Sequence, residues 1–203
     1  MKTFKEYEKS ARMITQIENY IPTVEAEQLQ SLREIGLNVE IPSTDGKRDC
    51  YINGIATSLK RTDIGAPSLI SNQIKATNYL KKYSVIYDTL KNSNGKMLLD
   101  IYSIDEIRDF IHYLAFSGTI NGIQPNPAQQ IVLSGRYTNN FGTFIYGHCI
   151  KIDDIASLDK LMQCLKIEYL NKKGLGLRIN ISNYKLIFNI NKKRIFKSEI
   201  VGL

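Results

Sequence analysis

An acidic residue and a lysine flank a predicted β-hairpin in the N-terminal part of the chain. Asn53-Gly54 lies between two runs rich in strand-forming residues, and this dipeptide favours a two-residue turn because both positions need positive φ. Counting outward from the turn pairs Asp49 with Ser58. Side chains alternate along a strand, so Lys60 shares a face with Ser58. The register therefore predicts a polar cluster of Asp49, Ser58 and Lys60 on one face of a sheet.

An acid and a lysine held in this way can bind a divalent metal ion and position an attacking water. The structural alternative is a cross-strand charge pair on an exposed hairpin, which is worth only roughly a few tenths of a kcal/mol. Spacing alone does not separate the two interpretations. The elements around the hairpin must decide between them.

Hydrophobic spacing and turn residues predict the elements that position this cluster. Helices are expected over residues 4–20, 23–36, 68–80, 103–118 and 157–170, and strands over residues 37–41, 84–90, 96–102, 131–137, 143–152, 175–181, 184–190 and 194–201. The helix that follows residue 103 begins with a capping box formed by Ser103 and Glu106. This order predicts an α/β (α+β) fold in which helices flank a central mixed sheet.

The charge is concentrated in a β-rich C-terminal part. Of the net charge of +7, all lies in residues 166–203, which hold nine Lys or Arg against two Glu. Residues 119–130 are rich in Asn, Gly and Pro and predict a boundary or functional loop between residues 1–118 and 119–203, within one compact unit. The basic segment indicates an anionic partner, with nucleic-acid phosphates the leading candidate, or else a solvated basic face.

Cysteine usage and hydropathy limit the setting of the protein. The three cysteines are widely spaced and odd in number, which favours a reduced, cytoplasmic location and argues against a thiolate metal site. No apolar run approaches the ~20 residues of a membrane-spanning helix, and no segment is typical of a signal peptide. We therefore expect a cytoplasmic protein with no membrane span.

The order helix, strand, strand, strand, helix, strand over residues 23–90 resembles the core of PD-(D/E)XK nucleases. In that core and in this sequence, the second strand carries an acid and the third strand carries a lysine. Residues 57–79, TSLKRTDIGAPSLISNQIKATNY, also resemble a segment of HpaII-type type II restriction endonucleases. In that segment a Ser-x-Lys strand end leads into Gly-x-Pro-(Thr/Ser)-Leu, and then into Ala-Thr-Asn and an aromatic residue. The resemblance covers about residues 48–87.

This resemblance implies roles for the residues of the hairpin. Asp49 would hold Mg²⁺, with Mn²⁺ as a substitute, and Lys60 would position the attacking water. Ser58 would line the site. It stands where PD-(D/E)XK nucleases in general have their second acid, whereas the resemblance to the HpaII-type segment implies a small polar residue as a variant at this position. A hydroxyl is a weaker Mg²⁺ ligand than a carboxylate. Candidates for the missing carboxylate are Glu34, Glu27, Glu40 and Asp63.

Further residues are expected to contact DNA, although each could equally be an ordinary surface residue. Amide side chains bind adenine and arginine binds guanine in the major groove, while lysine and arginine contact phosphates. The candidates are Asn72, Gln73, Arg136, Asn139, Lys172, Lys173, Arg178, Lys192, Lys193 and Arg194.

The sequence therefore predicts a type II restriction-type DNA endonuclease that uses Mg²⁺ to cut double-stranded DNA at a short specific site. Cutting both strands of a palindrome needs two active sites, so a homodimer is expected. One alternative is a non-catalytic nucleic-acid-binding protein on a degenerate nuclease core. Another is an interaction module whose basic C-terminal part binds an acidic protein.

Overall fold

The computed structural model describes residues 23–43, 46–70, 87–119, 122–123, 126–169, 177–188 and 195–203. The chain forms two compact units, Met1–Leu37 and Asn38–Leu203. Helices and a mixed sheet are both present, which confirms the predicted mixed fold class. The helix expected over residues 4–20 lies outside the described residues.

The described part of the first unit is helix α2 (Thr23–Glu34), which confirms the helix expected from residue 23. Gly36 ends it with φ of 89°, a left-handed conformation that glycine adopts without steric cost. The Gly36 N–H donates to Arg33 O at 2.9 Å, and the Leu37 N–H donates to Leu32 O at 3.2 Å. These two bonds satisfy carbonyl groups of the last helical turn, which otherwise have no partner within the helix.

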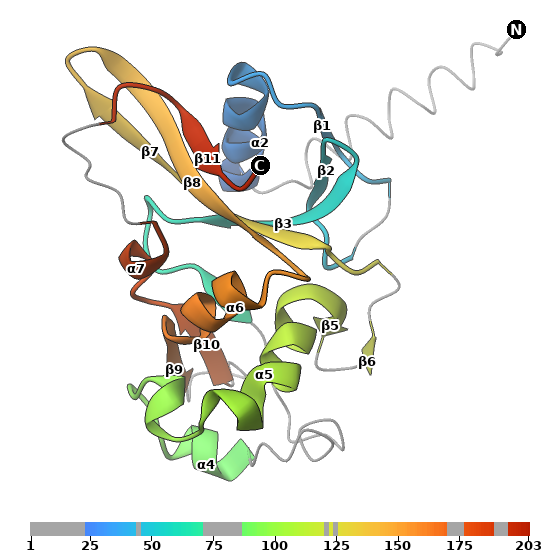
Figure 1. Ribbon diagram of the computed structural model, residues 1–203, viewed down its shortest axis with the longest axis vertical. Coiled ribbons are helices and arrows are strands. Elements are labelled where there is room, and N and C mark those ends of the chain that lie inside the picture. The colour runs from blue at the N-terminus through green and yellow to red at the C-terminus, as the bar shows by residue number, and fades with distance from the viewer. Residues whose placement is uncertain are drawn as a thin grey trace, which may run out of the picture. The chain divides into compact units, whose positions relative to one another are not determined.

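The second unit is built on a sheet with the strand order β1-β2-β3-β7-β8-β11 (Figure 1). Its strands are β1 (Val39–Glu40), β2 (Cys50–Ile52), β3 (Ile55–Arg61), β7 (Gln130–Asn139), β8 (Gly142–Lys151) and β11 (Glu199–Val201). Strands β1, β2 and β3 pair antiparallel, and so do β7 and β8. Strand β3 pairs with β7 in parallel, as β11 does with β8.

The predicted hairpin and its register are confirmed. Asn53 and Gly54 have φ of 52° and 79°, so both turn residues adopt the positive φ that the dipeptide favours. Cys50 pairs with Thr57, and Ile52 pairs with Ile55, as counting outward from the turn predicts.

Between β3 and β7 the chain passes through helices, because two parallel strands cannot be joined by a tight turn. The described helices there are α4 (Tyr87–Lys91) and α5 (Ile104–His112), and a π-helical turn, Tyr113–Ser117, extends α5. The predicted capping box at the start of α5 is confirmed, since the Ser103 N–H donates to Glu106 Oε2 at 2.7 Å.

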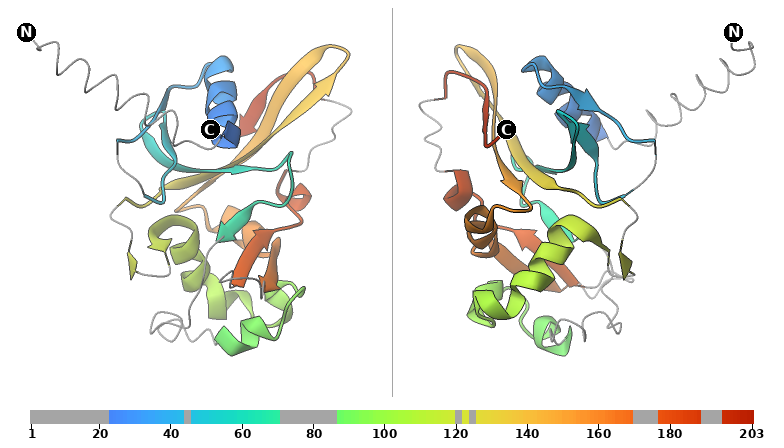
Figure 2. Two further views of the ribbon diagram at one scale, coloured as in Figure 1. Left: turned by 180° about the vertical axis from the view of Figure 1, so that it is seen from behind. Right: turned by 45° about the vertical axis from the view of Figure 1, so that its right-hand side comes forward.

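One apolar core lies against one face of the larger sheet. Ile107 and Phe110 of α5 pack in the same buried cluster as Ile131 and Leu133 of β7. Helix α6 (Ile155–Met162) and a smaller antiparallel sheet contribute to this core, and Figure 2 shows them on the same side as α5. The smaller sheet has the order β4-β10-β9, with β4 (Ser68–Ile70), β10 (Leu177–Ile181) and β9 (Leu165–Tyr169).

A buried polar chain on the opposite face of the larger sheet links three of its strands. The Gln130 Nε2 group donates to Thr57 Oγ1 at 2.8 Å, and Cys149 Sγ lies 3.2 Å from Gln130 Oε1. All three side chains are buried. Because a buried polar group without a partner is costly, this chain favours one register for β3, β7 and β8.

Several predicted elements are wrong. Ser68–Ile70 is strand β4 rather than the start of a helix, because it pairs with β10. Tyr87–Lys91 is helix α4 rather than a strand, and Leu98–Asp100 is a short 3₁₀ helix, η1. The predicted helix over residues 157–170 ends at Met162 and is followed by strand β9, and Lys185–Phe188 is helix α7 rather than a strand. Short apolar runs fit either period, so partners distant in sequence decide these segments.

The remaining described elements are short. Two-residue strands β5 (Gly118–Thr119) and β6 (Gly122–Ile123) pair antiparallel at the start of the segment expected to be a loop. The strand predicted over residues 194–201 is confirmed only as β11, Glu199–Val201.

We expect Gly54→Ala to lower the free energy of unfolding by about 1 kcal/mol, because alanine adopts positive φ only with strain. Gly54→Asn is the matched control and should lose less, since asparagine tolerates the left-handed region. Urea denaturation with an unchanged slope measures both values. Equal losses in the two variants would contradict the role assigned to the turn.

Candidate active site

The Asp49 carboxylate is fixed at the start of β2 by the neighbouring strand β3. The Asp49 N–H donates to Thr57 O at 2.8 Å. Its Oδ2 atom accepts hydrogen bonds from the Leu59 N–H at 2.6 Å and from Ser58 Oγ at 3.2 Å. A carboxylate with two donors on one oxygen is held in a single orientation. Asp49 and Ser58 are therefore in contact, as the register predicts.

Ser58 orients Asp49. Its side chain is 1% exposed, and its hydroxyl is directed at the carboxylate. A hydroxyl has one donor, so the bond to Asp49 uses that donor. Without a cation between them, a carboxylate at position 58 would repel the Asp49 carboxylate at this distance.

Lys60 lies at the edge of the core, two residues beyond Ser58 on the same face of β3. In the parallel ladder, Ser58 pairs with Ile131 and Lys60 with Leu133. Paired residues share a face, so this polar row borders the apolar core and Lys60 is only partly buried. The lysine stem can pack on apolar neighbours while its ammonium group stays near water.

Lys47 is a further member of the cluster that the sequence interpretation missed. Its Nζ donates to Leu69 O at 3.3 Å, and its N–H donates to Asn126 O at 3.0 Å. Gly46 permits this approach, because a Cβ at position 46 would collide with Asn126. The available signal was alternation: Lys47 stands two residues before Asp49, as Lys60 stands two residues after Ser58.

The charges of Lys47, Asp49 and Lys60 interact. The pKa of Lys47 is lowered to about 8: burial is the largest cause, the positive charge of Lys60 adds to the lowering, and the negative charge of Asp49 opposes it. At pH 7 the Lys47 ammonium group is therefore still mostly protonated. The site brings together one carboxylate and two ammonium groups.

The other predicted carboxylates are placed differently. Glu40 is exposed on β1, where its Oε1 accepts a hydrogen bond from Asn38 Nδ2 at 3.3 Å. Partial burial would raise the pKa of Asp63, but its two contacts with Arg61, at 2.8 and 3.0 Å, hold that pKa below its ordinary value. Glu27 and Glu34 lie on α2 in the first unit, so their contribution stays a prediction.

These side chains limit how a magnesium ion could be held. Among the described residues, no three His, Cys, Asp or Glu side chains gather in one place that could hold a metal ion. Mg²⁺ usually takes one or two carboxylates and completes its shell with waters and substrate phosphates. Asp49 therefore fits a magnesium site that a DNA phosphate helps to form.

Two of the three buried thiols, Cys149 and Cys164, are poorly suited to this chemistry. Burial raises the pKa of the Cys149 thiol to about 11, and it does the same for Cys164. Both are therefore neutral thiols at pH 7, and a neutral thiol is a poor nucleophile and metal ligand.

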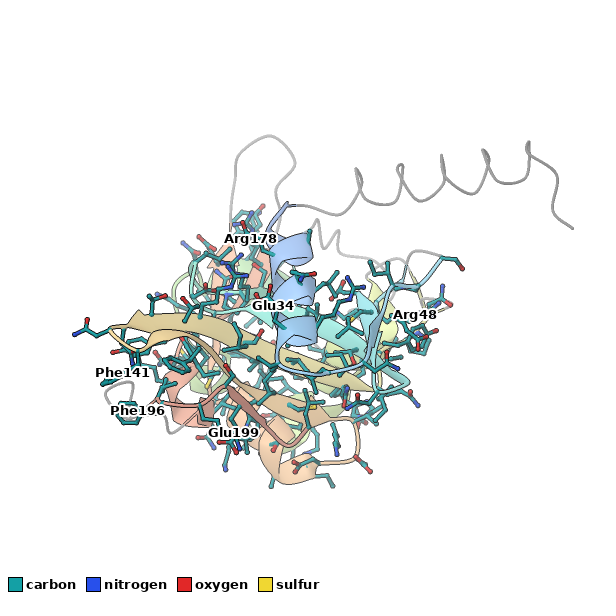
Figure 3. All side chains as sticks on the ribbon, turned by 90° about the horizontal axis from the view of Figure 1, so that it is seen from above. Glu34, Arg48, Phe141, Arg178, Phe196 and Glu199 are labelled. Atoms are coloured by element: carbon teal, nitrogen blue, oxygen red, sulfur yellow. The ribbon has the colours of Figure 1, made fainter. Side chains whose placement is uncertain are left out.

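Three of the residues expected to contact DNA are described, and they lie in two different sheets. Arg136 and Asn139 are both on β7. Arg178, which is labelled in Figure 3, is on β10, where it pairs with Glu168. The Asn139 side chain stabilises its own turn, since Nδ2 donates to Ile195 O and Oδ1 accepts from the Phe141 N–H. The other candidates, Asn72, Gln73, Lys172, Lys173, Lys192, Lys193 and Arg194, lie outside the described residues.

No protein-family model matches this chain, and no curated protein sequence matches it either. In the part of the chain that the structure describes, no helix has the length and apolar character needed to cross a membrane.

Replacing Lys47 by methionine should stabilise the fold by about 2 kcal/mol at pH 7. A pKa that falls from 10.5 to about 8 corresponds to about 3 kcal/mol against the charged form in the folded state, with burial as the largest cause, and loss of the hydrogen bond to Leu69 O offsets about 1 kcal/mol of the gain. Chemical denaturation measures the difference. Lys96→Met, at an exposed position, is the control and should change little.

The stability gain of Lys47→Met over the wild type should shrink as the pH rises. Below pH 8 both states of the wild type carry the proton and the full cost is present. Between about pH 8 and 10.5 the folded state loses the proton first, so wild-type stability rises relative to Lys47→Met. A stability difference that stayed constant across this window would contradict the burial of a charged Lys47.

Asp49→Ala should lower the free energy of unfolding by about 2 kcal/mol, because the Leu59 N–H would lose its acceptor. Asp49→Asn keeps a carbonyl oxygen for this bond and should lose clearly less. Comparison of their denaturation midpoints measures the difference. If both variants were as stable as the wild type, the bond would not hold β2 against β3.

Proposed function

We propose that this protein is a Mg²⁺-dependent DNA endonuclease of the type II restriction type, which hydrolyses phosphodiester bonds in double-stranded DNA. The observation that carries the proposal is the fixed Asp49 carboxylate with Lys60 on the same face of the hairpin and Lys47 within electrostatic range. Fixed groups of opposite charge beside one another are typical of sites for polar reactions rather than of solvated surface pairs.

The topology around the hairpin gives further support to the resemblance with PD-(D/E)XK nucleases. Three antiparallel strands, β1, β2 and β3, are followed by helices and then by β7, which pairs in parallel with β3. The fourth strand of that element order was expected at residues 84–90, where the structure has helix α4 over Tyr87–Lys91. The proposed core therefore uses β7 and extends to about residue 139.

The site residues have separate tasks in the proposed reaction. Water adds its oxygen to phosphorus, the bond from phosphorus to a deoxyribose oxygen breaks, and that oxygen takes up a proton. The Lys60 ammonium group donates hydrogen bonds that position the water and stabilise the negative charge that develops on phosphorus. Asp49, oriented by Ser58, would hold the metal ion. When bound, Mg²⁺ supplies charge neutralisation and a more acidic water.

The composition is compatible with a DNA substrate. The net charge of +7 resides in residues 166–203, and basic segments favour contact with phosphates. We further propose a homodimer, because cleavage of both strands at one site requires two copies of the hairpin.

A second candidate is a DNA-binding protein without nuclease activity. It is favoured by the lack of three clustered metal-ligating side chains among the described residues. In that case Asp49 would keep only its contacts to Ser58 and Leu59.

Incubation with unmethylated plasmid DNA and Mg²⁺ tests the proposed activity. The wild type should give discrete fragments, and Asp49→Asn and Lys60→Met should each reduce the rate at least ~100-fold, because each removes a group acting on the reacting phosphate. Asp153→Asn and Lys151→Met, at exposed positions, are matched controls and should cut at the wild-type rate.

Salt-sensitive DNA binding without cleavage in Mg²⁺ or Mn²⁺ would support the second candidate instead. If the full chain failed to bind DNA even at low salt, both candidates would be wrong.

A further inference from the structure

Lys47 has no task in the chemistry assigned to Asp49 and Lys60. Its ammonium group is nevertheless held in the cluster, partly buried, by its hydrogen bond to Leu69 O. Burying an ammonium group costs free energy, so a lysine at this position indicates a use for its charge.

The charge balance of the cluster favours an anion. Asp49 carries one negative charge, and Lys47 and Lys60 carry one positive charge each, so the three side chains sum to +1. The Asp49 Oδ2 atom already accepts two hydrogen bonds, from Leu59 and Ser58. Without Lys47 the sum would be zero, and without Asp49 it would be +2.

The ammonium groups also have donors to offer. An ammonium group has three N–H donors, and among the described residues Lys47 donates one of them, to Leu69 O. The bond anchors Lys47 to β4, while Lys60 belongs to β3. An ammonium group anchored to β4 and another carried by β3 can bind separate oxygens of one tetrahedral anion, and lysine binds phosphate as a point charge.

We propose that Lys47 and Lys60 form an anion site beside Asp49 that binds a backbone phosphate of DNA without a divalent metal ion. The proposal rests on the proposed function for the identity of the anion. Lys47 acts in binding, so it is distinct from Lys60, which also acts on the water. A bound phosphate would bring negative charge to a site whose three side chains sum to +1, and so would favour a divalent cation beside Asp49.

Binding of a short DNA duplex to the full chain in EDTA, measured by fluorescence anisotropy over a range of salt concentrations, tests this site. The wild type should bind, and Lys47→Met should bind about fivefold or more weakly, with a salt dependence reduced by about one phosphate contact. Lys47→Arg keeps the charge and should restore most of the affinity. Lys151→Met controls for the loss of an exposed lysine and should bind like the wild type.

Asp49→Asn provides the sharpest comparison, because it should bind DNA more tightly than the wild type in EDTA while losing cleavage. Inorganic phosphate provides a second probe, since its ³¹P signal should broaden with wild-type protein and much less with Lys47→Met.

The outcomes separate this inference from the proposed function. If Lys47→Met binds DNA in EDTA as tightly as the wild type, or if the wild type binds only with Mg²⁺, the anion site is wrong even where plasmid is cut. If the predicted binding changes occur without any cleavage in Mg²⁺ or Mn²⁺, the anion site stands and the nuclease proposal fails.

Discussion

The hydrogen bond from the Leu59 N–H to the Asp49 carboxylate is the contact on which the candidate site depends. At 2.6 Å it joins the residue before β2 to the middle of β3, where a regular ladder would use a backbone carbonyl. One side chain thus both completes the strand pairing and acquires a fixed orientation. By itself this bond is a contact between two strands. The proposed chemistry depends on Lys47 and Lys60, whose charges interact with each other and, for Lys47, with Asp49.

Local signals predicted the parts of the fold that local chemistry controls. Three local features depend on only one or two residues each and could be predicted from the sequence. They are the Asn53-Gly54 turn, the capping box before α5 and the glycine that ends α2. The strand expected over residues 84–90 is wrong, because its apolar residues fit both periods and Tyr87–Lys91 is helix α4. The strand that pairs in parallel with β3 is β7, which lies in a distant segment, and no local rule points to it.

The residues of the candidate site also divide into those that local sequence predicts and those that tertiary packing determines. Asp49, Ser58 and Lys60 follow from the hairpin register, since alternation fixes which side chains share a face. Lys47 requires knowledge that a carbonyl from β4 and the backbone of Asn126 meet the segment before β2. Those contacts arise from tertiary packing, so sequence spacing gave only a weak indication of this lysine.

The parallel pairing of β3 with β7 has a consequence for how the protein is made. The hairpin of β2 and β3 is local and can form within microseconds, but β7 must first emerge from the ribosome and close a long loop. Until then, the edge of β3 that later pairs with β7 has unpaired backbone groups, and strands of other chains can pair with it. A nascent chain therefore has an incomplete candidate site and an aggregation-prone strand edge at the same time. The pairing of β7 with β3 completes the site and covers the edge.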